Sequence, residues 1–352
     1  MRRITWWFGL LVGILLIAAA PIVRWGVAPA VTHLPGNTDT LRVYTGTAST
    51  VINPSVLRGT LFGPALLHDQ PVTVQHRVTV LDTKGNNALV SERKTVSLPG
   101  TTIANVVHRY AVDRKTMDRG SGFNDVTAQT GVTFNWPIHT QKKDYTGWVG
   151  DTQSTTTLHY AGTATRGGVK TYIFTSTVPS ARITDPAMLA TLPAAMPKSL
   201  LNSLVPSLGL SLDQLKQLGE LLPKLPDPVP FAYLYNSTST FWVAPDSGVV
   251  VDVAAHEVRT SAVVVAGQPV PVGAVLDFSY TAPPLTVQAA ANDAKDKASQ
   301  MQMISSTIPL VALITGSVLL LVVIGVAVVS RRRGDTELPP IPAPPRELTP
   351  VG

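Results

Sequence analysis

The segment IPLVALITGSVLLLVVIGVAVV, residues 308–329, decides how the chain is organised. It holds no charged residue, and only Thr315 and Ser317 interrupt its apolar run. At about 1.5 Å per residue, a helix of this length spans roughly 33 Å, enough to cross a hydrocarbon core of about 30 Å. The sequence therefore predicts a transmembrane helix over residues 304–330.

The charges that flank this segment predict its orientation. Arg331, Arg332 and Arg333 follow it directly. Arginines at the end of an apolar helix resist translocation and mark the cytoplasmic side. We therefore expect residues 331–352, a basic and proline-rich tail, to be cytoplasmic and to lack regular structure.

A second apolar segment, residues 4–23, follows Arg2 and Arg3 near the N-terminus. One interpretation is a secretory signal peptide that is cleaved after the alanines at 18–20. Pro21 would then follow the cut, where proline is poorly tolerated, so the sequence favours an uncleaved anchor over residues 1–23. Both ends would be cytoplasmic, and the chain between the two spans would lie outside the plasma membrane.

Composition excludes several classes of function. The chain contains no cysteine, which rules out disulfides, thiol catalysis and cysteine-based metal sites. The formal net charge is +6. Half of this positive excess lies in the two end segments, where arginines flank the predicted membrane spans. The region between the spans has no basic run with interleaved aromatic residues. We therefore expect no nucleic-acid partner.

The region 24–283 predicts an exterior α+β domain dominated by antiparallel strands, followed by a helical stalk over residues 284–303. Residues 72–81 alternate apolar and polar side chains, as a half-buried strand does. Turn residues such as Gly85 separate such strands into hairpins. The predicted strands span residues 41–51, 72–81, 88–98, 104–112, 132–136, 155–160, 169–177, 231–235, 239–243, 249–265 and 270–280.

A leucine-rich stretch, residues 185–225, interrupts the strand pattern and predicts two or three short helices. Ser211 and Gln214 have capping-box spacing, and leucines then recur on one helical face. One hypothesis is that this insert contacts a lipid acyl chain. The alternative is that it covers one end of the β core. The candidate lipid-contacting residues are Leu200, Leu204, Leu212, Leu215, Leu218 and Leu222.

Catalytic motifs are missing from the sequence. It has no nucleophile elbow, no phosphate-binding loop, no dinucleotide fingerprint and no metal-binding histidine spacing. His139, Asp144 and Asp151 share one polar segment, where a carboxylate–histidine site is one hypothesis and a solvated loop the favoured one. We therefore predict no catalytic, cofactor-binding or metal-binding residues.

Several segments together resemble a known family. They are the two terminal spans, residues 136–145, the strand TYIF at 171–174 and the run FWVAPDSGVVVD at 241–252. This combination resembles an actinobacterial family of double-anchored cell-envelope proteins of unknown function, often labelled the porin PorA family. The resemblance implies an envelope role, such as the handling of lipoglycans or other cell-wall lipids, and supplies no catalytic residues.

Three functions are compatible with these features. The favoured one is a non-enzymatic protein that binds or hands on a lipid or lipid-linked glycan beside the membrane. An enzyme acting on envelope glycans would need two converging carboxyl groups, with Asp144 and Asp151 as candidates. A scaffold would use the proline-rich tail to dock a partner. A pore is disfavoured, since an outer-membrane barrel carries no long apolar helix.

Overall fold

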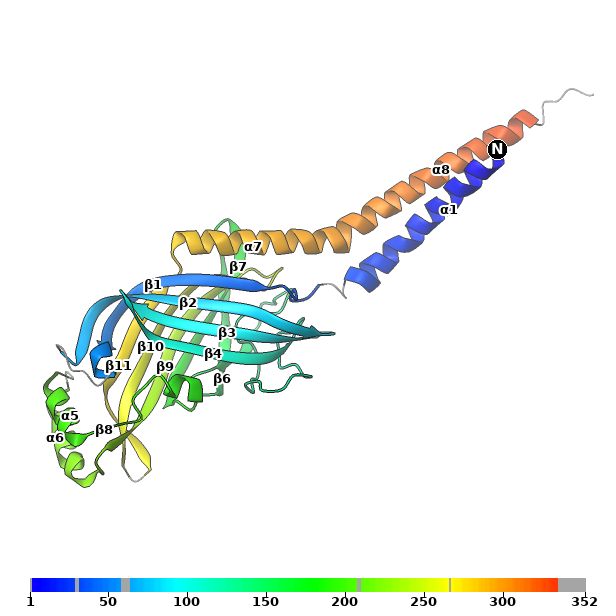
Figure 1. The fold of residues 1–352 in the computed structure, drawn as a ribbon. Coiled ribbons are helices and arrows are strands. Elements are labelled where there is room, and N and C mark those ends of the chain that lie inside the picture. Colours follow the sequence, from blue (N-terminus) through cyan, green and yellow to red (C-terminus); the bar gives the residue numbers. More distant parts are fainter. Residues whose placement is uncertain (1, 29–31, 58–63, 208–209, 266, 335–352) are drawn as a thin grey trace, which may run out of the picture. The chain divides into compact units, whose positions relative to one another are not determined.

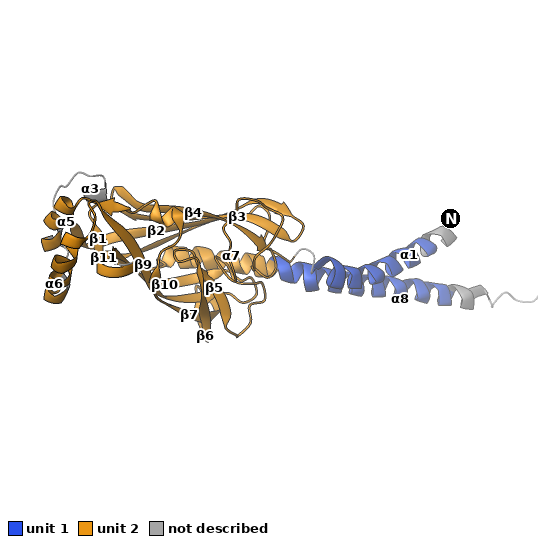
Figure 2. Ribbon diagram, turned by 90° about the horizontal axis from the view of Figure 1, so that it is seen from below, with its two compact units in different colours: residues 1–31, 300–352 blue, residues 32–299 orange. Residues whose placement is uncertain are grey.

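The computed structural model describes residues 2–28, 32–57, 64–207, 210–265 and 267–334. The chain divides into two compact units (Figure 2). The first contains the two ends of the chain, residues 1–31 and 300–352, and the second contains residues 32–299.

The first unit is a pair of helices long and apolar enough to cross a membrane. Its elements are α1 (Arg2–Pro21), η1 (Ile22–Val27), η4 (Met303–Thr307) and α8 (Ile308–Gly334). Glycines let α1 and α8 approach each other closely. A Cβ atom on Gly13 would lie 2.9 Å from Leu320, and one on Gly316 would lie 2.9 Å from Ile17. The order of these contacts shows that the two helices run antiparallel. Small residues at such a contact are typical of membrane helix pairs.

The second unit is built on one curved, open antiparallel sheet (Figure 1). Its strand order is β4-β3-β2-β1-β11-β10-β9-β7-β6-β5, with the short β8 paired to β9. The strands are β1 (Asp39–Ile52), β2 (Leu66–Lys84), β3 (Asn87–Leu98), β4 (Thr101–Asp113), β5 (Tyr145–Val149), β6 (Ser154–Arg166), β7 (Val169–Arg182), β8 (Ala195–Met196), β9 (Val229–Val243), β10 (Val250–Val265) and β11 (Gln268–Thr281).

Helices cover the two ends of this sheet. The insert between β7 and β9 packs on one end through a cluster that joins Leu201, Leu218 and Leu222 to Val263 of β10 and Val272 of β11. The helices of the second unit are α3 (Pro54–Leu57), α4 (Pro186–Leu189), α5 (Lys198–Leu204), η2 (Val205–Ser207), α6 (Leu212–Leu221), η3 (Leu222–Lys224) and α7 (Pro284–Gln302).

The predicted fold class is confirmed, and the structure corrects two details of it. Residues 132–136 form no ladder strand, although their alternation looked like one: Val132, Phe134 and Trp136 are buried, but the backbone makes one isolated bridge, to Gly147. The strands predicted at 231–235 and 239–243 are a single strand, β9.

The segment predicted as a helical stalk, residues 284–303, contains α7, and this helix packs on the sheet. Ala291 and Ala294 are buried against Val249 and Val251, next to the start of β10. Thr286 Oγ1 also donates a hydrogen bond of 2.8 Å to the carbonyl of Val43 in β1. Alanine side chains are short, so the helix lies close to the strands.

Candidate functional site: a cavity on the concave face of the sheet

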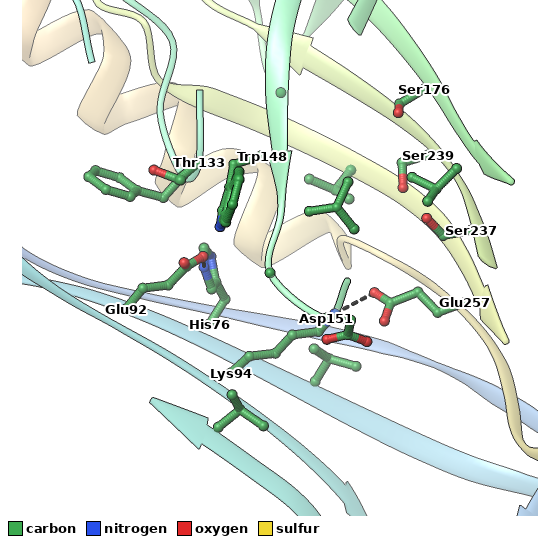
Figure 3. Close-up of a pocket in the computed structure, with 18 of the residues that line it drawn as sticks. His76, Glu92, Lys94, Thr133, Trp148, Asp151, Ser176, Ser237, Ser239 and Glu257 are labelled. Carbon is green, nitrogen blue, oxygen red and sulfur yellow. Dashed lines mark hydrogen bonds and ion pairs between the residues drawn. The ribbon is translucent and has the colours of Figure 1, made fainter. Parts of the chain in front are cut away.

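The concave face of the sheet encloses a cavity of about 250 Å³ (Figure 3). Strands from both halves of the sheet contribute its walls, and the segments around Phe134 and Trp148 also line it. The polar or charged lining residues are Tyr44, His76, Glu92, Lys94, His108, Tyr110, Thr133, Asp151, Thr156, Ser176, Tyr235, Ser237, Ser239, Glu257, Arg259 and Tyr280. The apolar part of the wall includes Val74, Val96, Ala104, Val106, Leu158, Val178, Phe241 and Val253.

The two-residue period of the strands explains why charged side chains point into the cavity. In β10, Val253, Glu257, Arg259 and Val263 occupy alternate positions and are all buried. Side chains two residues apart on a strand face the same side of the sheet. The charged pair of β10 therefore shares the inward face with the apolar core.

Arg259 is the centre of a buried charge network. Its side chain is 1% exposed, and its Nη2 atom lies 2.6 Å from Asp151 Oδ2 and 3.3 Å from Glu257 Oε2. Lys94 of β3 donates to Glu257 Oε1, and the hydroxyl of Tyr280 donates to the same oxygen at 2.8 Å. Each buried charge thus has an opposite charge in contact, as buried ions require.

These contacts keep the network ionised. Burial alone would raise the pKa of Glu257, but the nearby charges of Lys94 and Arg259 lower it to about 2. The same logic raises the pKa of Arg259, because Asp151 and Glu257 outweigh its desolvation. A carboxylate held this far below neutral pH carries no proton to give, so Glu257 lacks the raised pKa of a general acid.

Part of the Arg259 guanidinium has no hydrogen-bond partner in the described chain. Its Nε and Nη1 atoms are buried and have no acceptor within the described part of the chain. The group lies over the ring of Tyr235, 5.2 Å from its centroid. Unused buried N–H donors are costly unless something accepts from them. Arg259 thus lines the cavity, while two of its buried nitrogen atoms have no acceptor in the described chain.

Two histidine–carboxylate pairs add to the polar side of the cavity. His76 Nε2 lies 2.6 Å from Glu92 Oε1, and His108 Nε2 lies 3.0 Å from Asp185 Oδ2. Burial would lower the pKa of His108, but hydrogen bonding to Asp185 and its charge raise it above the ordinary value. Burial would raise the pKa of Asp185, and His108 in turn lowers it.

The wall of the cavity also carries hydroxyl groups. Ser176 of β7 and Ser239 of β9 are directly paired across the ladder (Figure 3). Ser237 lies two residues before Ser239 in the same strand. Ser176 Oγ lies 3.3 Å from the hydroxyl of Thr156. The cavity therefore combines an apolar lining with charged groups and small hydroxyls, and Ser237 is the cross-strand neighbour of Glu257.

A glycine turn fixes the segment around Trp136 that lines the cavity. Gly248 has φ +70°, and a Cβ atom there would lie 2.1 Å from the Trp136 carbonyl oxygen. The Trp136 amide donates to Gly248 O at 3.1 Å, and the Thr140 amide donates to Pro245 O at 2.9 Å. The run PDSG at 245–248 thus serves to dock this part of the cavity wall.

The leucines predicted to contact lipid have mixed surroundings. Leu218 is 5% exposed and Leu222 is also buried. In contrast, Leu212 is 84% exposed and Leu215 is 36% exposed. Leu200 packs partly buried against the same cluster. The side chain of Leu204 lies outside the described residues. Met188 of α4 lines the cavity, while the described leucines of this group are not among its lining residues.

The structure separates the two carboxylates of the enzyme hypothesis. Asp144 Oδ2 lies 2.9 Å from His159 Nδ1 on the exposed surface, and the Tyr160 amide donates to its other oxygen. The backbone bond from Tyr160 and the bond to His159 lower the pKa of Asp144. Asp151 pairs with Arg259 in the cavity, where Asp144 is not a lining residue.

Sequence reasoning missed Lys94, Glu257 and Arg259. A signal for them existed, because each lies on the same face of its strand as apolar residues: Lys94 alternates with Val90 and Val96, and Glu257 and Arg259 alternate with Val253 and Val263. Charges on the inward face of two separate strands predict a polar interior. Which charges meet depends on the strand order, which places β3 and β10 across the curved sheet from each other.

The family model described as Porin PorA matches residues 7–325, which include the whole sheet, the cavity and most of both membrane helices. The chain belongs to the Porin PorA family. A search of curated proteins gave no match. The matched region of this PorA-family protein thus joins a β-rich unit to two candidate membrane spans.

Proposed function

We propose that this PorA-family protein is a membrane-anchored binding protein for an amphiphilic ligand, a lipid or a lipid-linked glycan, held in the cavity of the sheet. The observation that carries this proposal is the make-up of the cavity, which joins an apolar wall to the charged side chains of Lys94, Glu257 and Arg259. Ligand sites are mostly apolar, with a few placed polar groups that fix orientation.

Membrane anchoring fits this role. The arginines at 2–3 and 331–333 flank the two spans and favour a cytoplasmic location for both ends. The antiparallel contact of α1 and α8 fits the same arrangement. The β-rich unit would then lie outside the plasma membrane, in the cell envelope, with both of its ends tied to the bilayer from which a lipid comes.

The chemistry of the cavity favours binding over hydrolysis. A glycan hydrolase needs one carboxyl group with a raised pKa as general acid, about 5 to 10 Å from a second carboxylate. Asp151 and Glu257 both contact Arg259 Nη2, and the pKa of Glu257 is lowered. The polar groups therefore suit the orientation of a head group better than proton transfer.

The family name points to a pore as the second candidate. A membrane pore made of strands needs a closed barrel, because lipid cannot satisfy free strand edges. The described strands follow a path that ends at β4 and β5. Conductance across a planar bilayer containing the purified protein tests this candidate directly, and a stable single-channel current would favour it over the binding role.

Lipid extraction tests the binding proposal. The full chain is purified in detergent, and copurified lipid is identified by mass spectrometry. Ser239→Phe and Ala104→Phe fill the cavity from opposite walls, and each is expected to lose most of the bound lipid while circular dichroism shows a folded protein. Thr155→Phe, on the exposed face of β6 and outside the lining of the cavity, is the matched control. Lipid retained by both cavity variants would overturn the proposal.

A further inference from the structure

A second, smaller cavity of about 40 Å³ adjoins the first at the α7 end of the sheet. Tyr44, His76, Phe134 and Val250 line both cavities, so these four side chains are the partition between them. The outer side of the small cavity is formed by the start of β1 and by α7.

An ion pair joins the two sides of this small cavity. Arg42 Nη2 of β1 lies 2.9 Å from Asp293 Oδ2 of α7, and both side chains are partly exposed. Lys297, one turn further along α7, contacts Asp293 at 3.2 Å. All three residues line the small cavity. The contact between α7 and β1 therefore includes an ion pair, Arg42–Asp293, whose groups water can solvate at a modest cost in free energy when the pair breaks.

The packing of α7 makes it the part of this rim that can move. Its buried residues are Ala290, Ala291 and Ala294, which bury little apolar area compared with leucine or phenylalanine. In contrast, the β1 side of the rim is held by a backbone ladder to β2 that begins at Asp39. A small displacement of α7 thus costs less than a displacement of the strand.

We infer that the small cavity is the portal through which ligand enters and leaves the large cavity, and that the Arg42–Asp293 pair is its gate. Opening breaks this pair and turns the side chains of the partition aside. The charged rim then meets the polar end of an amphiphile while the apolar part passes Tyr44, Phe134 and Val250. The identity of the cargo rests on the proposed function, but the existence of the passage does not.

Cysteine labelling tests the passage without any ligand. The chain has no cysteine of its own, so Ser239→Cys places one thiol in the large cavity. In this background Arg42→Asp and Asp293→Arg each break the gate, and the double exchange restores an ion pair of opposite direction. We expect each single change to speed labelling by a small uncharged maleimide about three- to fivefold, the factor that one partly exposed pair supplies. The double exchange should return the rate toward its original value.

The matched control is the exposed ion pair of Asp39 and Arg77, which joins β1 and β2 and lines neither cavity. Exchanging these charges singly or together should leave the labelling rate unchanged. Equal labelling rates in all gate variants would overturn the portal, and so would a rise in rate that the double exchange does not reverse.

Ligand kinetics separate the portal from the proposed function. A dansyl-labelled fatty acid is the probe, and the full chain in detergent is used without the added cysteine. A gate variant should raise the association and dissociation rates by the same factor and leave the Kd unchanged, because a portal alters the barrier and not the bound state. Failure of the wild-type protein to bind the probe counts against the proposed function, whereas the labelling result still decides the portal.

Discussion

At the residue scale, Glu257 holds the buried Arg259 and the partly buried Lys94 in place. Lys94 and Arg259 both contact its carboxylate, and its side chain is 4% exposed. Removing one partner of a buried ion pair leaves the other charges uncompensated, which costs more than the pair contributes in net stability. The geometry thus makes Glu257 a structural support of the cavity wall.

We expect Glu257→Gln to lower the free energy of unfolding by about 3 kcal/mol, because it leaves Arg259 and Lys94 short of negative charge. Urea denaturation of the full chain in detergent measures the change. Asp39→Asn, which removes a carboxylate from an exposed pair with Arg77, is the control and should have far less effect. A Glu257→Gln protein as stable as the control would contradict this account of the network.

His108 gives the cavity a pH-dependent contact with the insert. Its pKa in the folded state lies above the ordinary 6.5, since the Asp185 carboxylate, with Glu92 and Asp151 nearby, outweighs burial. A raised folded pKa means that the folded state binds the proton more tightly. The stabilisation is complete below about pH 6.5 and is lost as the pH rises through the raised pKa.

Thermal unfolding at a series of pH values checks this contact. The Tm difference between the wild type and His108→Gln should be largest below about pH 6.5 and should shrink toward alkaline pH. At the acid limit it should fall again when Asp185, whose pKa is lowered below 3.8, takes up a proton. A difference that stays constant between pH 5 and pH 9 would show that the charge of His108 is irrelevant.

At the element scale, the leucine-rich insert has two faces with different roles. Leu218 is 5% exposed in the cluster that covers the end of β10 and β11, while Leu212 is 84% exposed at the start of the same helix. A buried leucine contributes through the contacts that it fills, and an exposed one is available to a partner.

Paired alanine substitutions separate these roles. Leu218→Ala should lower the free energy of unfolding by about 2–5 kcal/mol, the usual cost of a cavity in a packed core. Leu212→Ala should leave stability unchanged, and any loss of lipid binding that it causes would support the predicted lipid contact of the insert. Equal stability of the two variants in urea denaturation would contradict the observed packing.

At the scale of the whole molecule, orientation follows from the arginine clusters. We expect both ends to be cytoplasmic and the β-rich unit to face outward. Single cysteines at Lys142, which is exposed in the β-rich unit, and at Thr336 in the tail test this. A membrane-impermeant maleimide should label Lys142→Cys on intact cells and Thr336→Cys only after permeabilisation. Labelling in the reverse order would overturn the predicted topology.

The fold class was predictable because it depends on local patterns. Alternation in 72–81 and 88–98 sufficed for the β2–β3 hairpin, and turn residues such as Gly85 located its turn. The prediction of a strand was wrong where apolar and polar side chains alternate without strand pairing. Residues 132–136 alternate because three side chains enter the core from a docked loop, and a single sequence does not distinguish that from strand pairing.

The sequence by itself determined the two apolar segments, the β-dominated character of the region between them and the position of the leucine-rich insert. These features depend on runs and periods within a few dozen residues. The tertiary structure alone decided the cavity, since Asp151 and Arg259 are 108 residues apart and Lys94 and Glu257 are 163 apart. Their contact arises from strand order and curvature, which no local pattern encodes.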